Sequence, residues 1–348
     1  MSKSVYFAIP GDLESRTGGY AYDRRMIREL QALGWQVHVL PLAASFPFPD
    51  GIALRETDSL LSSLPDQTLV LMDGLALGAM GTLAAQHQTR LRLIALCHHP
   101  LALESGLSQD MRQHFLQSEA SALAASRAVI VTSQASRALL PRLFAIAPER
   151  ITVAVPGTDP APFAPCTGRP PVLLCVATLT RRKGHDLLIE ALAAVQHLDW
   201  QARFVGADTF DRAWAETLRK RIQAKGLSER IVLTGSRNDL QAEYLHADVF
   251  VLPTRFEGYG MVFTEALSYG LPVIATQVDA VRDIVPETAG LLVAPEDHAA
   301  LAQALNRLLS DRALRHSLSL GARESAATLP RWRDSADIVA RLLQDFSS

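Results

Sequence analysis

Short apolar runs alternate with stretches of helical periodicity along the whole chain. The short runs are rich in Val, Ile and Leu, as buried strands are, and the stretches between them carry apolar residues at helical spacing, as in Tyr22–Leu33. This alternation predicts parallel sheets with helices on both faces. In the first half of the chain the expected strands are Val5–Ile9, Gln36–Leu40, Thr68–Met72, Leu91–Leu96 and Ala128–Thr132, with a further helix at Ser118–Ala125.

A segment near the middle of the chain breaks the pattern. Ala154–Pro171 is dense in Pro and Gly and has no helical period, which indicates a linker. We therefore predict two α/β domains, residues 1–165 and 166–330, followed by a terminal helical segment, 331–348. In the second domain the expected strands are Val172–Val176, Ala202–Val205, Ile231–Leu233, Val249–Leu252, Pro272–Ala275, Asp283–Ile284 and Gly290–Val293. The expected helices are His185–Val195, Arg212–Lys225, Leu240–His246, Leu301–Leu309, Asp311–Ala326 and Trp332–Phe346.

Composition and charge narrow the classes of function. Of the 348 residues 48% are apolar, and the net charge is −2, so a basic nucleic-acid-binding domain is not expected. The three cysteines, Cys97, Cys166 and Cys175, form no CxxC pair, which favours a reduced, cytoplasmic protein. We expect neither a signal peptide nor a membrane span, because no apolar run approaches the ~20 residues that a span requires. Peripheral contact with the inner face of the membrane stays open.

One turn between a strand and a helix concentrates the candidate chemistry. After Val249–Leu252 the chain passes Glu257, Gly258 and Gly260 and enters a short helix that carries Glu265. Glycines let a ligand approach the backbone, and the unpaired N–H groups at a helix start attract phosphate. Carboxylates accept hydrogen bonds from hydroxyl groups, so the glutamates suit a sugar and a ribose. Taken alone, the pattern is equally compatible with glutamates that only compensate the helix dipole.

Several motifs in sequence order resemble the family 4 glycosyltransferases. EGYGMVFTEALSYGLPVIA, residues 257–275, is similar to the E-x7-E signature of that family. TGGY (17–20), PGTD (156–159) and TRRKGHDLLIEAL (180–192) are similar to its glycine loop, the segment entering its linker and its phosphate-contacting segment. The resemblance covers most of the chain. It implies the GT-B fold, in which two Rossmann-like domains face each other across a cleft and the last helix crosses back to the N-terminal domain.

The resemblance implies that the C-terminal domain binds a nucleotide-diphosphate sugar, with UDP or GDP the most expected diphosphates. Glu257 would bind hydroxyl groups of the transferred sugar, and Glu265 would bind the ribose. Lys183 and Arg182 would neutralise the diphosphate as it gains negative charge on leaving. Further donor contacts are expected at Gly258, Tyr259, Gly260, Met261, Val262, Thr178, Gly206, Ser236 and Arg237.

The chain departs from the family after the strand Val172–Val176. The family often has a Gly-Arg pair there whose arginine touches the phosphate, and this chain has Ala177 and Thr178. Arg181 or Arg182 is expected to supply the missing charge. The nucleotide base is expected near the turn at 234–239.

In the N-terminal, acceptor-side domain the resemblance implies that Gly18 and Gly19 form a loop facing the substrates. His98 aligns best with a family histidine that contacts the donor sugar near the reacting carbon, and His99 is its neighbour. A metal site at the two histidines is the rival interpretation, but adjacent residues of an extended chain point apart. The chain contains no Asp-x-Asp pair, so we expect a metal-independent mechanism and no cofactor.

The sequence thus predicts a retaining glycosyltransferase that moves a sugar from a nucleotide-diphosphate sugar to an acceptor hydroxyl. The acceptor is open between a lipid, a polysaccharide and a small molecule. The first turn, PGDLESRTGGY, lacks the G-x-G-x-x-G of dehydrogenases with similar domains. Two alternatives stay open: a non-catalytic sugar-nucleotide-binding protein, and a phosphorylase or epimerase of the same fold.

Overall fold

The computed structural model describes residues 3–237, 239–278 and 280–347. These residues form two compact units, which we call unit 1 (Met1–Gly157 with Pro330–Ser348) and unit 2 (Thr158–Leu329). The chain passes from unit 1 to unit 2 after Gly157, which lies before the predicted domain boundary at residue 165. Ala164 already belongs to the core of unit 2, and its N–H donates to the carbonyl of Tyr269.

The described strands of unit 1 form a parallel six-stranded sheet in the order β2-β1-β3-β4-β5-β6. From β1 the chain adds β2 on one side of the sheet, and from β3 it adds strands on the other side. The switch point therefore lies between the carboxyl ends of β1 and β3. The strands are β1 (Ser4–Pro10), β2 (Gln36–Leu42), β3 (Leu69–Asp73), β4 (Arg92–Cys97), β5 (Ala128–Val131) and β6 (Ile151–Val153). The helices are α1 (Gly18–Ala32), α2 (Gly51–Ser63), α3 (Gly74–Leu77), α4 (Gly81–His87), α5 (Gln109–Ala125), α6 (Gln134–Phe144) and α14 (Trp332–Asp345).

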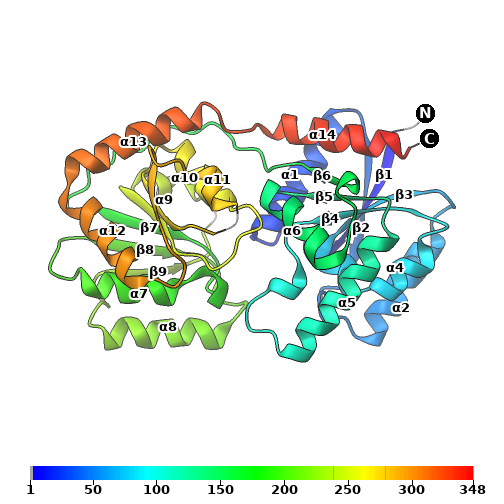
Figure 1. The fold of residues 1–348 in the computed structure, drawn as a ribbon, viewed down its shortest axis with the longest axis horizontal. Helices are drawn as coiled ribbons and strands as arrows, with labels where there is room; N and C mark the ends of the chain where they lie inside the picture. The colour runs from blue at the N-terminus through cyan, green and yellow to red at the C-terminus, as the bar shows by residue number, and fades with distance from the viewer. Residues whose placement is uncertain (1–2, 238, 279, 348) are drawn as a thin grey trace. The chain divides into compact units, whose positions relative to one another are not determined.

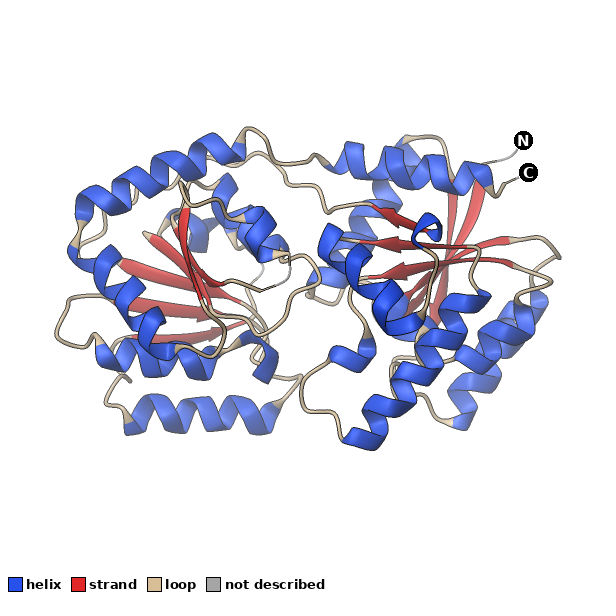
Figure 2. Cartoon of the chain, in the orientation of Figure 1, coloured by secondary structure: helices blue, strands red, loops and turns tan. Residues whose placement is uncertain are grey.

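Unit 2 repeats this plan with the described strand order β12-β11-β10-β7-β8-β9, again all parallel, and with its switch between β7 and β10. Helices lie on both faces of the sheet (Figure 2). The strands are β7 (Val172–Val176), β8 (Gln201–Val205), β9 (Ile231–Gly235), β10 (Val249–Leu252), β11 (Val273–Thr276) and β12 (Gly290–Val293). The helices are α7 (His185–Ala194), α8 (Arg212–Ala224), α9 (Gln241–Leu245), α10 (Met261–Ser268), α11 (Val281–Ile284), α12 (His298–Ser310) and α13 (Arg312–Ala326).

The predicted α/β class with parallel sheets is confirmed. Several described elements were not predicted, and two of the predicted segments have a different structure. Asp283–Ile284 is helical, as part of α11, and β11 pairs directly with β12. A pair of residues, of which only Ile284 is apolar, is too short to show a period that distinguishes a strand from a helix. Gly18 and Gly19, expected in a loop, form the first turn of α1 after the extended residue Thr17. The low helix propensity of glycine hid this turn in the sequence.

The last helix, α14, is part of unit 1, although the chain reaches it only after unit 2. It lies against α1 (Figure 1), where the Trp332 and Tyr22 rings meet edge to face at 5.7 Å. A Cβ on Gly157 would overlap the backbone of Trp332, so only glycine allows this close approach. No helix among the described residues combines the length and apolar character needed to cross a bilayer.

Candidate functional site

The loops that follow β7 and β10 lie at the switch point of unit 2. After β10 the chain runs through Glu257 to Gly260, which precedes α10 with a φ of +98°. Only glycine adopts this conformation readily. The helix therefore begins where the sequence predicted, and its first N–H groups have no partner within the helix. The loop after β7 contributes a short 3-10 turn, η3 (Arg181–Lys183).

These two loops bring the predicted charged residues together. The Lys183 Nζ lies 2.6 Å from Oε1 of Glu257, and an Arg182 guanidinium nitrogen lies 3.7 Å from Oε2. The same guanidinium donates to the carbonyl of Phe256 at 3.0 Å. Burial would raise the pKa of Glu257, but the two adjacent cations outweigh it and hold the pKa below its usual range. Glu257 is therefore an ionised, buried carboxylate.

The second glutamate of the motif is held by a tyrosine that the sequence analysis did not single out. The Tyr244 hydroxyl donates to Oε2 of Glu265 at 2.7 Å, and the Tyr244 ring stacks on Tyr269 with centroids 4.8 Å apart. Burial raises the pKa of Glu265, while the Tyr244 hydrogen bond works in the opposite direction. Tyr244 thus fixes one oxygen of this carboxylate and leaves the other for a further partner.

Arg255 is a second residue that the sequence analysis missed. Its guanidinium forms a two-pronged pair with Asp186 at 2.9 and 3.0 Å and also bonds Glu296, and its backbone N–H donates to the carbonyl of Arg182. It therefore ties the loop after β10 to the start of α7. The sequence TRFEGYG shows an arginine next to the motif, but it does not indicate which carboxylates this arginine binds.

The two arginines of η3 have different partners. The Arg181 guanidinium stacks over the Trp214 ring, 4.2 Å from its centroid, while Arg182 lies beside Glu257. Arg182 and Lys183 thus share Glu257 as a partner. Thr178 is half-buried, and a Cβ on Gly206 would overlap the carbonyl of Ala177, so this glycine is needed for packing.

The other predicted donor contacts lie at the edge of unit 2 and along α10. Ser236 and Arg237 are exposed after β9, and Arg237 pairs with Glu243 at 3.6 Å. Asn238, in the turn expected near the base, lies outside the described residues. The remaining predicted residues occupy the turn before α10 and its first helical positions: Gly258, Tyr259, Gly260, Met261 and Val262.

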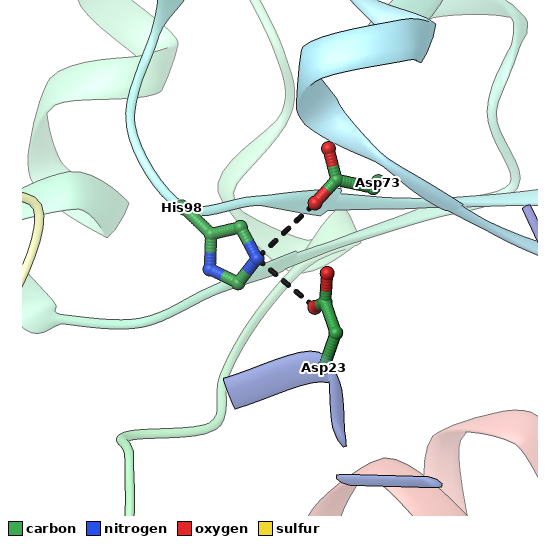
Figure 3. Close-up of side chains that lie close together, drawn as sticks. All are labelled: Asp23, Asp73 and His98. Atoms are coloured by element: carbon green, nitrogen blue, oxygen red, sulfur yellow. Dashed lines mark hydrogen bonds and ion pairs between the residues drawn. The ribbon is translucent and has the colours of Figure 1, made fainter. Parts of the chain in front are cut away.

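In unit 1 the predicted histidine lies between two carboxylates. His98 follows β4, and its Nε2 lies 3.1 Å from an Asp23 oxygen and 3.4 Å from an Asp73 oxygen (Figure 3). Asp23 comes from α1 and Asp73 ends β3, and both are buried. His99 bonds Glu104 at 3.1 Å, so the neighbouring histidines do point to different partners. Asp23 and Asp73 were not predicted, because they are distant in sequence from His98.

Burial and neighbouring charges shift the pKa values of His98 and Asp23. Burial would lower the pKa of His98, but Asp23 and Asp73 raise it to about 10. Burial raises the pKa of Asp23 to about 7 against the opposing effect of His98. The three residues also form the one group in the described part of the chain whose candidate ligand atoms lie within 4.8 Å of one another.

Two family models match consecutive parts of the chain. The model described as Glycosyltransferase Family 4 matches residues 21–162, and the model described as Glycosyl transferases group 1 matches residues 163–325. This chain belongs to the family 4 glycosyltransferases. The predicted family is thereby confirmed.

Curated relatives of this family 4 chain share about a third of the residues in the matched part. The lipopolysaccharide core biosynthesis mannosyltransferase LpsB of Rhizobium meliloti (strain 1021) is 33% identical over 163 residues, which are 45% of this chain and 44% of LpsB. D-inositol 3-phosphate glycosyltransferase 1 of Catenulispora acidiphila is 31% identical over 246 residues, 65% of this chain and 58% of that protein. The matches span about half the length of these relatives.

Solved structures of similar fold cover nearly the whole chain. Sucrose-phosphate synthase from Thermosynechococcus elongatus superposes with a TM-score of 0.83 at 23% identity, covering 99% of this chain and 98% of that one. Anabaena HepE in complex with UDP-glucose gives a TM-score of 0.80 at 18% identity, covering 98% and 99%. Likeness at this identity concerns the fold, and it confirms the GT-B class for this family 4 chain.

Proposed function

We propose that this family 4 chain is a glycosyltransferase that moves a sugar from a nucleotide-diphosphate sugar to an acceptor hydroxyl. The observation that carries the proposal is the cluster of Glu257, Lys183 and Arg182 beside the start of α10. Two fixed cations and open helix N–H groups suit a diphosphate, and a buried ionised carboxylate suits sugar hydroxyls. Unit 2 is then the donor unit and unit 1 the acceptor side.

The chemistry follows from where charge develops. As the glycosidic bond breaks, the diphosphate gains negative charge, and preorganised cations stabilise that charge without reorganising. Arg182 offers a planar fork to two oxygens, while Lys183 acts as a point charge. Both now neutralise Glu257, so an arriving diphosphate would share them with this carboxylate. Glu265, with one oxygen held by Tyr244, offers its other oxygen to the ribose.

We further propose that transfer is metal-independent and retains the anomeric configuration. Lys183 and Arg182 supply the positive charge that a metal ion supplies in other transferases. Retention is carried over from the family, with attack on the same face and the departing phosphate taking the acceptor proton. Relatives named as GDP-mannose-dependent mannosyltransferases and a HepE structure with UDP-glucose support GDP and UDP as the diphosphates to test first.

Product analysis tests the proposal. The full chain is incubated with UDP-glucose or GDP-mannose and a panel of lipid, saccharide and small-molecule hydroxyl acceptors, with and without EDTA. We expect a glycoside with the donor's anomeric configuration, formed at the same rate in EDTA. An inverted product would contradict retention, and loss of activity in EDTA would contradict metal independence.

The same experiment separates the alternatives. A sugar 1-phosphate formed from an oligosaccharide and phosphate would indicate a phosphorylase. A changed sugar still attached to its diphosphate would indicate an epimerase. Tight donor binding with no product from any acceptor would favour a non-catalytic binding protein. In a separate liposome pull-down, strong binding to anionic lipid would contradict our expectation of a soluble or loosely peripheral enzyme.

A further inference from the structure

The buried cluster of Asp23, Asp73 and His98 has a fixed geometry. Asp73 Oδ1 accepts the Leu75 N–H at 2.7 Å, so this oxygen caps α3 and leaves Oδ2 for His98. A Cβ on the following residue, Gly74, would lie 2.9 Å from the carbonyl oxygen of Leu96, so the chain here is pressed against β4. The Asp73 carboxylate therefore has little freedom to turn away from the ring.

Asp23 reaches the same ring nitrogen from α1. It is fully buried, and its second oxygen, Oδ2, has no hydrogen-bond partner among the described residues. Its neighbour Tyr22 presents its ring edge-on to His98, with centroids 5.3 Å apart, and anchors α1 through a hydrogen bond to the Ala154 carbonyl. A buried carboxylate is costly unless a cation or strong donor faces it. His98 is the group that faces it.

The two nitrogen atoms of the His98 ring have different surroundings. A Cβ on Gly19 would lie 3.3 Å from Cδ2 of His98, so α1 closes over the edge that carries Nε2. Nδ1 points away from both carboxylates (Figure 3), and no hydrogen bond to it is found in the described part of the chain. The side chain keeps 17% of its surface exposed. The edge that carries Nδ1 is thus left for a ligand.

We propose that Asp23 and Asp73 are positioning residues that keep His98 as an imidazolium, with Nε2–H shared by the two carboxylates and Nδ1–H offered to a hydrogen-bond acceptor of a ligand bound at unit 1. That this ligand is a substrate of sugar transfer rests on the proposed function. The charge state does not. In a neutral ring with its proton on Nε2, Nδ1 would accept a hydrogen bond, so the aspartates decide whether His98 donates or accepts there.

The other titratable groups around the ring do not compete for this proton. Burial and nearby carboxylates raise the pKa of Tyr20 to about 12, and burial raises that of Tyr22 still further. Burial, Glu119 and Asp73 raise the pKa of the Cys97 thiol well above its ordinary value. All three stay neutral near pH 7. His99 on the next position bonds Glu104 instead.

The charge state is measured directly by nuclear magnetic resonance on the full chain labelled with ¹⁵N-histidine. The His98 signals are assigned by their loss in His98→Asn, since the chain has ten histidines. We expect both ring nitrogens of His98 to stay protonated from pH 6 to pH 9, with deprotonation near pH 10. A neutral ring at pH 7, or displacement of the ring proton by added Zn²⁺, would overturn the proposal.

Two variants test the role of each aspartate. Asp23→Asn and Asp73→Asn keep the shape of the side chain and remove its charge, and each should lower the His98 pKa by about 1–3 units. The matched control is Asp58→Asn, which removes the carboxylate from another Asp–His pair, 2.8 Å from His87. This control variant should leave the pKa of His98 unchanged. If Asp73→Asn does not fold because the α3 cap is weakened, Asp23→Asn and the wild-type titration still decide the matter.

Activity gives a second readout. With the His98 pKa lowered to about 8, only about a tenth of the rings stay protonated at pH 9. The rate of Asp23→Asn relative to wild type should therefore fall about tenfold more at pH 9 than at pH 6. An equal loss at both pH values would indicate a merely structural role. If the titrations behave as expected and no transfer is found with any donor, the proposed function fails and the charge state of His98 stands.

Discussion

Lys183 and Glu257 lie 74 residues apart in the sequence and 2.6 Å apart in the structure. Each residue belongs to a different sequence motif. They form a pair because β7 and β10 are neighbours in the sheet. Contacts between residues that are distant in the sequence also explain which site residues the sequence analysis missed. Asp23 and Tyr244 lie far from their partners in sequence and belong to no motif that we used, so their roles depend on tertiary contacts.

Glu257 gives a prediction at the scale of one residue. Glu257→Gln keeps the size of the side chain and removes the carboxylate that we assign to the sugar hydroxyls. We expect turnover to fall by about 10²–10³, by analogy with the loss of one preorganised group, while the Kd of the nucleoside diphosphate changes only a few-fold. Glu190→Gln, which alters the Glu190–Lys225 pair of the same 2.6 Å length outside the site, is the control. Equal loss of turnover and diphosphate affinity would contradict the assignment.

Lys183 gives the complementary prediction. A charge-assisted contact contributes about 1.5–3 kcal/mol, so Lys183→Ala should weaken nucleoside-diphosphate binding by about 10–100-fold in calorimetry. Because the variant also leaves Glu257 with one cation fewer, its folded fraction is checked by circular dichroism. Lys225→Ala, which removes the exposed lysine that pairs with Glu190, should bind as wild type does. Unchanged affinity in Lys183→Ala would move the phosphate site elsewhere.

At the scale of elements, the central strands were the most predictable part. β7 and β10 were located to the residue, because both are short apolar runs buried on both faces. The helices α2, α3, α4 and α6 and the strand β6 were not predicted. The weak period of the Asp283–Ile284 pair led to a strand where α11 lies. Helix boundaries near glycines, such as Gly18, depend on capping and packing that propensity alone does not reveal.

Gly184 links the two loops of the site, and its replacement tests that link. It has a φ of +70°, and a Cβ there would overlap the carbonyl oxygen of Pro253. Gly226 has a similar φ of +67° but open space around it. Gly226→Ala should therefore cost about 1 kcal/mol of unfolding free energy for its backbone alone.

Gly184→Ala should cost clearly more than Gly226→Ala and should also weaken diphosphate binding, since the clash displaces the turn that carries Lys183. Urea unfolding and calorimetry on both variants measure this difference. Equal costs in the two variants would mean that the loops move apart easily and that the packing at Pro253 does not position the site.

At the scale of the whole molecule, the chain leaves unit 1, forms unit 2 and returns to unit 1 with α14. Trp332 is buried there against Tyr22 on α1, the helix that also carries Asp23. Trp332→Ala should cost about 3–5 kcal/mol, as for other buried large-to-small changes. Hydrogen exchange should quicken in unit 1 and stay unchanged in unit 2. Faster exchange throughout both units would show that they do not fold as separate cooperative bodies.

The central claim is that unit 2 holds a nucleoside diphosphate through Lys183 and Arg182. The most direct test is calorimetry of wild type and Lys183→Ala with UDP, GDP and ADP, each with and without EDTA. We predict that one diphosphate binds wild type with one site per chain, that EDTA leaves its Kd unchanged, and that Lys183→Ala binds it at least tenfold more weakly. Failure of all three diphosphates to bind wild type would contradict the account.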